Sequence, residues 1–147
     1  MSNTLYDRDF AAWAHEQAAL LRSGHLSKAD IDHIAEEIES MGRTEKRELV
    51  SRLGVLPRHL LQRRYQPDRR GASWQTTIRV QRRALARHLR DNPSLKASLS
   101  KPIDEGYGDA VIEAAGETDL PEGVFPATCP WGFDQFMDPA FWPDEGD

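Results

Sequence analysis

The apolar residues in the first half of the chain recur with the period of an α-helix. Spacings of three and four residues place them on one helical face, and the phase continues through Gly42. An interior proline removes a backbone donor and clashes with the preceding turn, so Pro57 is expected to kink this helix. We therefore predict one long, kinked helix over residues 28–65. Its inner face consists of Ile31, Ile34, Ile38, Met41, Leu49, Leu53, Leu56 and Leu60.

The same period predicts further helices over residues 5–22, 73–91 and 94–116. The last of these is less regular, because Pro102, Gly106 and Gly108 each oppose helix formation. No alternating pattern typical of β-strands occurs in the sequence. The predicted fold class is therefore all-α, a helical bundle of about four main helices that forms a single domain over residues 1–147.

Prolines and aromatic residues dominate the chain after Gly116. They predict an extended tail with one short helix over residues 131–137. Large aromatic side chains bury much apolar surface, so we expect this tail to cover the bundle. Its aromatic residues are Phe125, Trp131, Phe133, Phe136, Phe141 and Trp142.

The sequence also excludes several classes of protein. Cys129 is the only cysteine, so neither an internal disulfide nor a zinc site of paired thiolates can form, and we expect a packed thiol. No apolar run approaches the roughly 20 residues of a membrane helix, and the acidic N-terminus does not resemble a secretory signal. We expect a soluble cytoplasmic protein without a cofactor.

Charge is segregated along the chain, although the formal net charge is only −5. Residues 43–90 contain fourteen Lys and Arg but three Asp and Glu. Residues 1–42 contain three basic and eight acidic residues, and residues 91–147 contain two and thirteen. An acidic, a basic and a second acidic segment follow one another, which indicates a polarised surface.

Five arginines of the basic segment form a ridge on one face of the predicted helix 73–91. At 100° per residue, this face points away from the apolar side chains of the same helix. Like charges in such a row repel, so they need an external counter-charge. The ridge, our candidate for anion or partner binding, consists of Arg79, Arg82, Arg83, Arg87 and Arg90.

Three sources of counter-charge remain open. The first is the acidic segment 104–122 of the same chain together with water and salt, and the second is an acidic surface on a partner protein or on a second copy. The third is nucleic acid phosphate, although the negative net charge and the lack of a DNA- or RNA-binding motif count against it. A nucleic acid footprint would extend over Arg63, Arg64, Arg69 and Arg70.

Glu45 interrupts the apolar face of the long helix. A carboxylate on a packed face needs a partner, so we predict a buried polar brace of Glu45, Arg52, His59 and Trp74. The alternative is an enzyme of unknown reaction, whose site would involve Glu37, Glu45, Arg52 and His59. His33 lies within helical reach of Glu36 and Glu37, but these residues lie off the apolar face, and we expect no metal there.

Short motifs occur over nearly the whole chain. The most specific motif is Ala35-Glu36-Glu37-Ile38-Glu39-Ser40-Met41-Gly42, and others are Tyr6-Asp7-x-Asp9-Phe10-x-x-Trp13, Tyr65-Gln66-Pro67, Ser73-Trp74 and the ending from Cys129-Pro130 to Trp142. In these motifs the chain resembles a bacterial family catalogued as Domain of Unknown Function 29. The resemblance implies a stand-alone helical domain and implies no activity. Pro57, Gly106 and Gly108 depart from the usual residues of the family, and these departures affect the expected local helix geometry rather than the expected fold.

These patterns favour a non-enzymatic binding or interaction module that acts through its basic surface. The alternatives are a nucleic-acid-associated protein that uses the arginine ridge, and the enzyme described above. An acidic protein surface or a second copy is the partner that we expect, and no membrane is involved.

Overall fold

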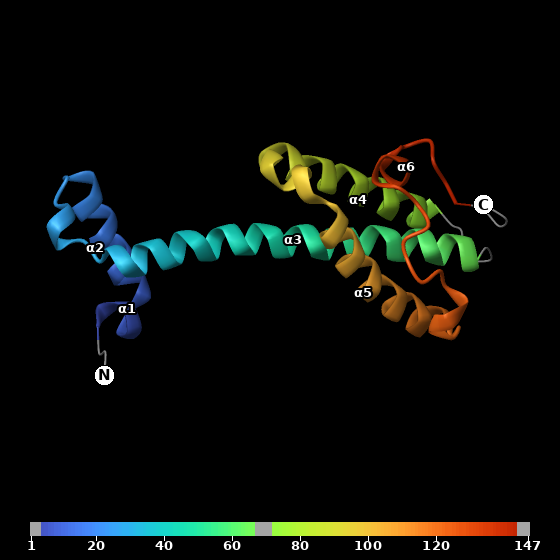
Figure 1. Cartoon of the computed structure of the whole chain (residues 1–147), viewed down its shortest axis with the longest axis horizontal. Helices are drawn as coiled ribbons and strands as arrows, with labels where there is room; N and C mark the ends of the chain where they lie inside the picture. Colours follow the sequence, from blue (N-terminus) through green and yellow to red (C-terminus); the bar gives the residue numbers. More distant parts are fainter. Residues whose placement is uncertain (1–3, 67–71, 144–147) are drawn as a thin grey trace. The chain divides into compact units, whose positions relative to one another are not determined.

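The computed structural model describes residues 4–66 and 72–143, and every regular element among them is a helix (Figure 1). The all-α fold class is confirmed. The α-helices are α1 (Leu5–Arg8), α2 (Phe10–Arg22), α3 (Ile31–Tyr65), α4 (Ala72–Asp91), α5 (Ser100–Thr118) and α6 (Phe133–Met137). Three short 3-10 helices join them, η1 (Leu26–Lys28), η3 (Pro93–Ser98) and η4 (Glu122–Val124).

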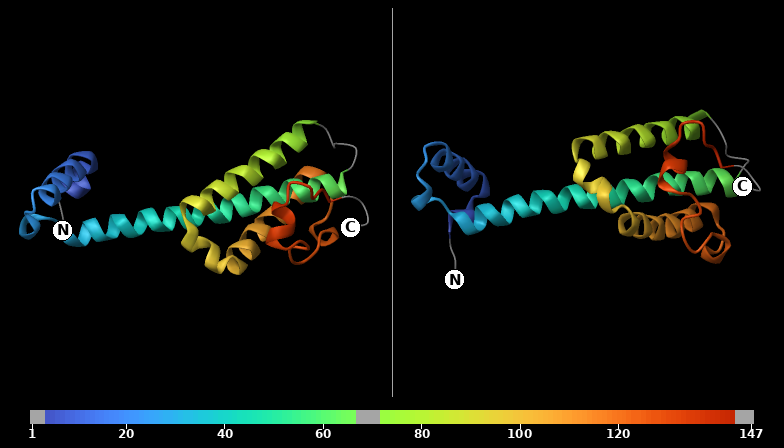
Figure 2. Two further views of the ribbon diagram at one scale, coloured as in Figure 1. Left: turned by 90° about the horizontal axis from the view of Figure 1, so that it is seen from above. Right: turned by 45° about the horizontal axis from the view of Figure 1, so that its top comes forward.

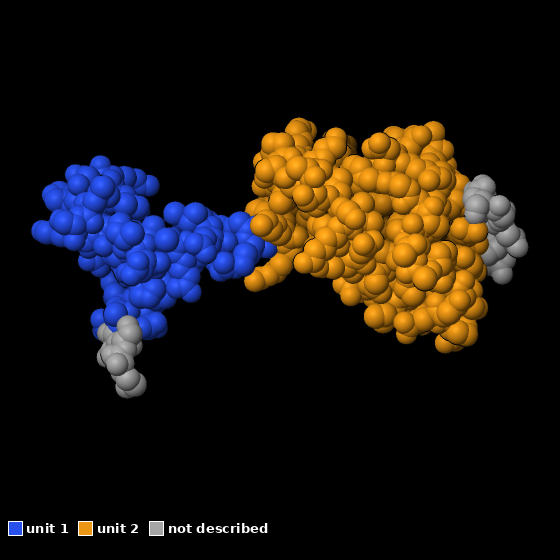
Figure 3. Space-filling model, viewed as in Figure 1, with its two compact units in different colours: residues 1–44 blue, residues 45–147 orange. Residues whose placement is uncertain are grey.

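The chain divides into two compact units, residues 1–44 and residues 45–147 (Figure 3). Helix α3 contributes its first fourteen residues to the first unit and the remainder to the second. That the whole chain behaves as a single domain stays a prediction. Among the described helices, none combines the length and the apolar character that a bilayer crossing requires.

The predicted helix 5–22 is interrupted at Asp9, which separates α1 from α2. Asp9 has φ −150° and ψ 85°, and its carboxylate accepts a hydrogen bond from the Ala12 amide. This side chain caps the second helix, because it satisfies one of the amide groups that a helix start leaves free. The prediction of one continuous helix over residues 5–22 is therefore wrong at Asp9.

Helix α3 begins at Ile31, three residues later than predicted, and runs without a break through Gly42 and Pro57. The Asp30 carboxylate lies directly before it and accepts a hydrogen bond from the His33 amide at 3.4 Å. A carboxylate in this position caps the amides of the first turn and opposes the positive end of the helix dipole.

The apolar face of α3 is buried only in the second unit. Leu49, Leu53, Leu56 and Leu60 are fully buried, whereas Ile31, Ile38 and Met41 are 54%, 59% and 62% exposed. The prediction that the whole row faces one interior is wrong for these three residues. Periodicity shows which residues share a face, and it does not show whether another element covers that face.

The core of the second unit lies where α4 and α5 flank the C-terminal part of α3 (Figures 1 and 2). Ile78, Leu85 and Leu89 of α4 pack there with the leucines of α3. The aromatic tail covers this core as predicted. Phe125, Trp131 and Phe136 are buried in it, and Phe133, Phe141 and Trp142 pack against it partly buried.

Helix α5 begins at Ser100 instead of residue 94, because residues 93–98 form the 3-10 helix η3. This start places Pro102 in the first turn of α5, where an amide would have no partner within the helix. A start at residue 94 would have placed the same proline in the helix interior, where it removes a hydrogen bond and clashes. Pro102 is thus compatible with a helix that begins at Ser100, whereas helical periodicity alone predicted a start at residue 94.

Helices α3 and α5 make backbone contact at two glycines. A Cβ atom on Gly106 would lie 2.8 Å from the Gly54 nitrogen and 2.9 Å from the Val50 carbonyl oxygen. The buried face of α5 continues in small residues at intervals of four, Gly106, Ala110, Ala114 and Thr118. The glycine that seemed to oppose helix formation therefore permits the close approach of the two helices.

We expect Gly106→Ala to lower the free energy of unfolding by about 1–3 kcal/mol, because the added methyl group meets backbone atoms that cannot move independently. Gly108→Ala is the matched control on the same helix. A Cβ there meets nothing within 4 Å, so we expect unchanged or slightly higher stability. Urea unfolding of the two variants tests this, and equal effects would contradict the proposed helix contact.

Candidate functional site

Four of the five predicted ridge arginines lie exposed on α4. These are Arg79, Arg83, Arg87 and Arg90, which we call the arginine surface. The prediction is wrong for Arg82, which is only 5% exposed and lies against the C-terminal segment. Helical phase placed Arg82 at the edge of the ridge, and the tail covers that edge.

Arg82 connects α4 to the tail through its guanidinium group. Its Nε donates to the Phe136 carbonyl at 2.8 Å, and its Nη2 donates to the Phe141 carbonyl at 2.6 Å. The Phe136 carbonyl lies in the last turn of α6, where helices leave carbonyl groups unsatisfied. The guanidinium also lies 5.1 Å from the ring centre of Trp142, and burial lowers the pKa of Arg82. Arg82 is thus a structural anchor.

Two glutamates of the acidic segment 104–122 contact α3. Its Glu113 pairs with Arg58, and its Glu117 accepts a hydrogen bond from Gln62. Arg90 contacts its neighbour Asp91 at 3.6 Å. Among the residues that the structure describes, no ion pair involves Arg79, Arg83 or Arg87. The source of their counter-charge stays a prediction.

The arginine surface borders a hollow of about 330 Å³ with a mixed lining. The side chains of Arg79 and Arg83 line one part of it, and Met137 and Pro139 of the tail line another. Cationic groups beside apolar ones suit a ligand that carries both an anionic and an apolar group.

Arg63 and Arg64, which we predicted to extend a nucleic acid footprint, contact aromatic rings in the described part of the chain. The Arg63 guanidinium lies 4.8 Å from the ring centre of Trp142, and the Arg64 guanidinium lies 5.4 Å from that of Tyr65. Both cations thus lie on aromatic faces that would otherwise be free to stack on bases. Arg69 and Arg70 lie outside the described residues.

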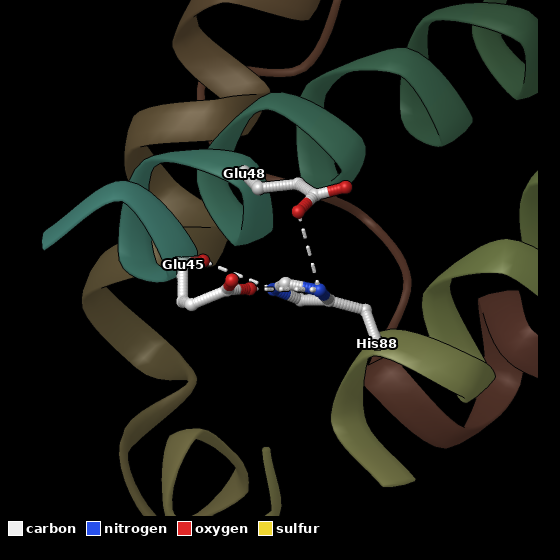
Figure 4. Close-up of side chains that lie close together, drawn as sticks. All are labelled: Glu45, Glu48 and His88. Atoms are coloured by element: carbon white, nitrogen blue, oxygen red, sulfur yellow. Dashed lines mark hydrogen bonds and ion pairs between the residues drawn. The ribbon is translucent and has the colours of Figure 1, made fainter. Parts of the chain in front are cut away.

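A polar cluster joins α3 to α4 beside the arginine surface (Figure 4). The His88 imidazole is 7% exposed, and its Nδ1 lies 3.6 Å from the Glu45 carboxylate and 3.5 Å from that of Glu48. Its Nε2 lies 2.9 Å from the backbone carbonyl oxygen of Glu45. Arg52 donates to the Glu48 carboxylate through Nε at 3.1 Å and Nη2 at 2.8 Å, which lowers the pKa of Glu48.

The predicted brace of Glu45, Arg52, His59 and Trp74 does not form as a unit. No hydrogen bond or ion pair within the described part of the chain links these four residues to one another. Glu45 and Arg52 instead share the cluster with Glu48 and His88, which sequence reasoning missed. His88 follows Leu85 by three residues on the apolar face of α4, and this spacing was the available signal.

His59 and Glu37 each have a partner outside the predicted catalytic group of Glu37, Glu45, Arg52 and His59. His59 bonds Gln62 at 3.3 Å, and burial lowers its pKa. Glu37 lies in the first unit and accepts a hydrogen bond from the Tyr6 hydroxyl, which raises the pKa of Tyr6 to about 12. Trp74 is partly buried on α4.

His33 belongs to a structural cluster in the first unit. Its Nδ1 lies 2.7 Å from the Asp30 carboxylate, and its ring stacks on Tyr6 with 3.9 Å between centres. The hydrogen bond between His33 and Asp30 raises the pKa of His33 and lowers that of Asp30. Trp13 also donates to Asp30, at 3.0 Å. The contacts thus run to Asp30, although the sequence suggested Glu36 and Glu37 as neighbours.

The helices, the buried core and the aromatic tail define an all-α protein with a basic surface on one helix. The chain belongs to the family described as domain of unknown function DUF29, whose model matches residues 5–142. Comparisons with curated proteins and with solved structures gave no match.

We expect Arg82→Lys to lower the free energy of unfolding by about 2–4 kcal/mol. The ammonium keeps the charge but cannot reach both carbonyls in the fork geometry of a guanidinium, and it leaves a buried acceptor unpaired. Arg83→Lys, one residue further on the exposed face, is the control and should change stability by less than about 0.5 kcal/mol. Chemical denaturation of both variants checks the difference, and similar values would argue against the anchoring role.

Proposed function

We propose that this protein is a non-enzymatic interaction module that binds an acidic segment of a partner protein through the arginine surface. The proposal rests on one observation, the three guanidinium groups of Arg79, Arg83 and Arg87 that lack an ion pair among the described residues. Like charges on one helical face repel each other, and carboxylates of a partner relieve this repulsion. Guanidinium groups bind carboxylates with two parallel hydrogen bonds, which adds specificity to the charge attraction.

Two features favour a protein partner over nucleic acid. The net charge of −5 repels a polyanion at long range, whereas a short acidic segment interacts mainly with the local surface. In addition, Met137 and Pro139 beside Arg79 and Arg83 offer an apolar contact. The best-fitting ligand is thus an acidic segment with an adjacent apolar side chain.

The test uses Arg79→Gln/Arg83→Gln, which removes two positive charges from the surface and leaves the anchor Arg82 in place. The control is Arg22→Gln/Lys101→Gln, which removes the same charge from exposed positions elsewhere. We expect the first variant to bind a fluorescent Glu-rich peptide with one leucine about tenfold more weakly than the wild type, since each surface contact contributes about 0–1 kcal/mol. Fluorescence anisotropy at low and moderate salt measures the affinity, which should fall as salt rises.

The alternatives give different results in the same experiment. Equal weakening in the control variant would indicate unspecific attraction and refute the proposal. Binding of duplex DNA or RNA in place of the peptide, lost in the Arg79→Gln/Arg83→Gln variant, would support the nucleic acid alternative. A wild-type dimer in light scattering that this variant abolishes would identify a second copy as the partner.

A further inference from the structure

The cluster of Glu45, Glu48 and His88 has the composition and spacing of a metal site. The two glutamates lie three residues apart on α3, and His88 faces them from α4 (Figure 4). One donor atom from each residue lies within 4.8 Å of the other two, and this is the one group of three such residues found in the described part of the chain.

The hydrogen bond of His88 determines which of its nitrogens faces the carboxylates. The Glu45 carbonyl oxygen can only accept, so Nε2, 2.9 Å away, must carry a hydrogen. In the neutral imidazole, Nδ1 then has its lone pair free and directed at the two carboxylates. A histidine whose other nitrogen donates to a backbone carbonyl is the usual arrangement of a metal ligand.

Two of the three distances between the donor atoms fit a tetrahedral ion. Ligands about 2.1 Å from zinc lie about 3.4 Å from one another in a tetrahedron. The separations from Nδ1 of His88 to the carboxylates of Glu45 and Glu48 are 3.6 Å and 3.5 Å. The three donor atoms together lie within 4.8 Å of one another, so the two carboxylates close around the ion when it binds.

The residues around Glu45, Glu48 and His88 also suit a bound metal ion. Arg52 holds Oε1 of Glu48 and thereby leaves Oε2, the atom closer to His88, free to bind an ion. The cluster opens into a hollow of about 360 Å³ lined also by Arg87, Asp91 and Asn92. This space accommodates a water molecule as a fourth ligand.

We propose that Glu45, Glu48 and His88 bind one divalent transition metal ion, with Zn²⁺ as the best-fitting ion. One imidazole and two carboxylates are ligands that zinc accepts, whereas Mg²⁺ and Ca²⁺ prefer oxygen alone. The site holds the ion between α3 and α4 with one position open to solvent. None of its ligands belongs to the arginine surface, although Arg87 of that surface lines the hollow beside them.

The experiment is a calorimetric titration of the full chain with ZnCl₂ after treatment with a chelator. We expect one ion per chain, and at least tenfold weaker binding in Glu45→Gln and in Glu48→Gln, which keep side-chain size and lose the anionic donor. Arg52→Gln retains all three ligands but loses the orientation of Glu48, so we expect a loss of about tenfold. Co²⁺ in place of Zn²⁺ should give the intense visible absorption of a tetrahedral site in the wild type, and not in the two glutamate variants.

The control is His15→Gln/Glu16→Gln, which removes an exposed imidazole and an exposed carboxylate from α2. It should bind zinc as the wild type does. The absence of saturable binding in the wild type would overturn the proposal and leave the cluster as an ion pair of protonated His88. Unchanged affinity in both glutamate variants, or equal loss in the control, would assign the ion to the surface and would likewise overturn it. Circular dichroism confirms that each variant is folded.

Discussion

The backbone contact between Gly54 and Gly106 is the constraint on which the packing of the second unit depends. Because neither residue has a side chain, α3 and α5 approach closely, and Ala114 of α5 is buried in the core with the leucines of α3. A larger residue at either glycine would separate the helices and open the core along α5.

The tail depends on this core and in turn determines which arginines remain exposed. Phe136 and Trp131 bury their rings against the core, which brings the carbonyls of residues 136 and 141 within reach of Arg82. Arg82 therefore differs from its neighbour Arg83 in environment, although both have the same side chain and adjoin in sequence. Glu113 and Glu117 of α5 contact α3, where they meet Arg58 and Gln62.

The two features that we connect with function share an origin in the pairing of α3 with α4. The faces that pack together bring His88 to Glu45 and Glu48, and the opposite side of α4 presents the arginine surface. Arg87 lies between them, because it belongs to the arginine surface and also lines the hollow beside His88. One helix, α4, thus carries a basic surface on one side and a polar cluster on the other.

The sequence by itself determined the all-α class, the long third helix, the aromatic tail and the outward direction of four arginines. All of these follow from local periodicity and composition, which depend on residues a few positions apart. The tertiary structure alone decided that Ile31, Ile38 and Met41 stay exposed, that Arg82 is buried, and that Glu45 meets His88 rather than His59. Each of these outcomes depends on which distant segment covers a given helical face. Helical phase defines such faces and contains no information about what lies against them.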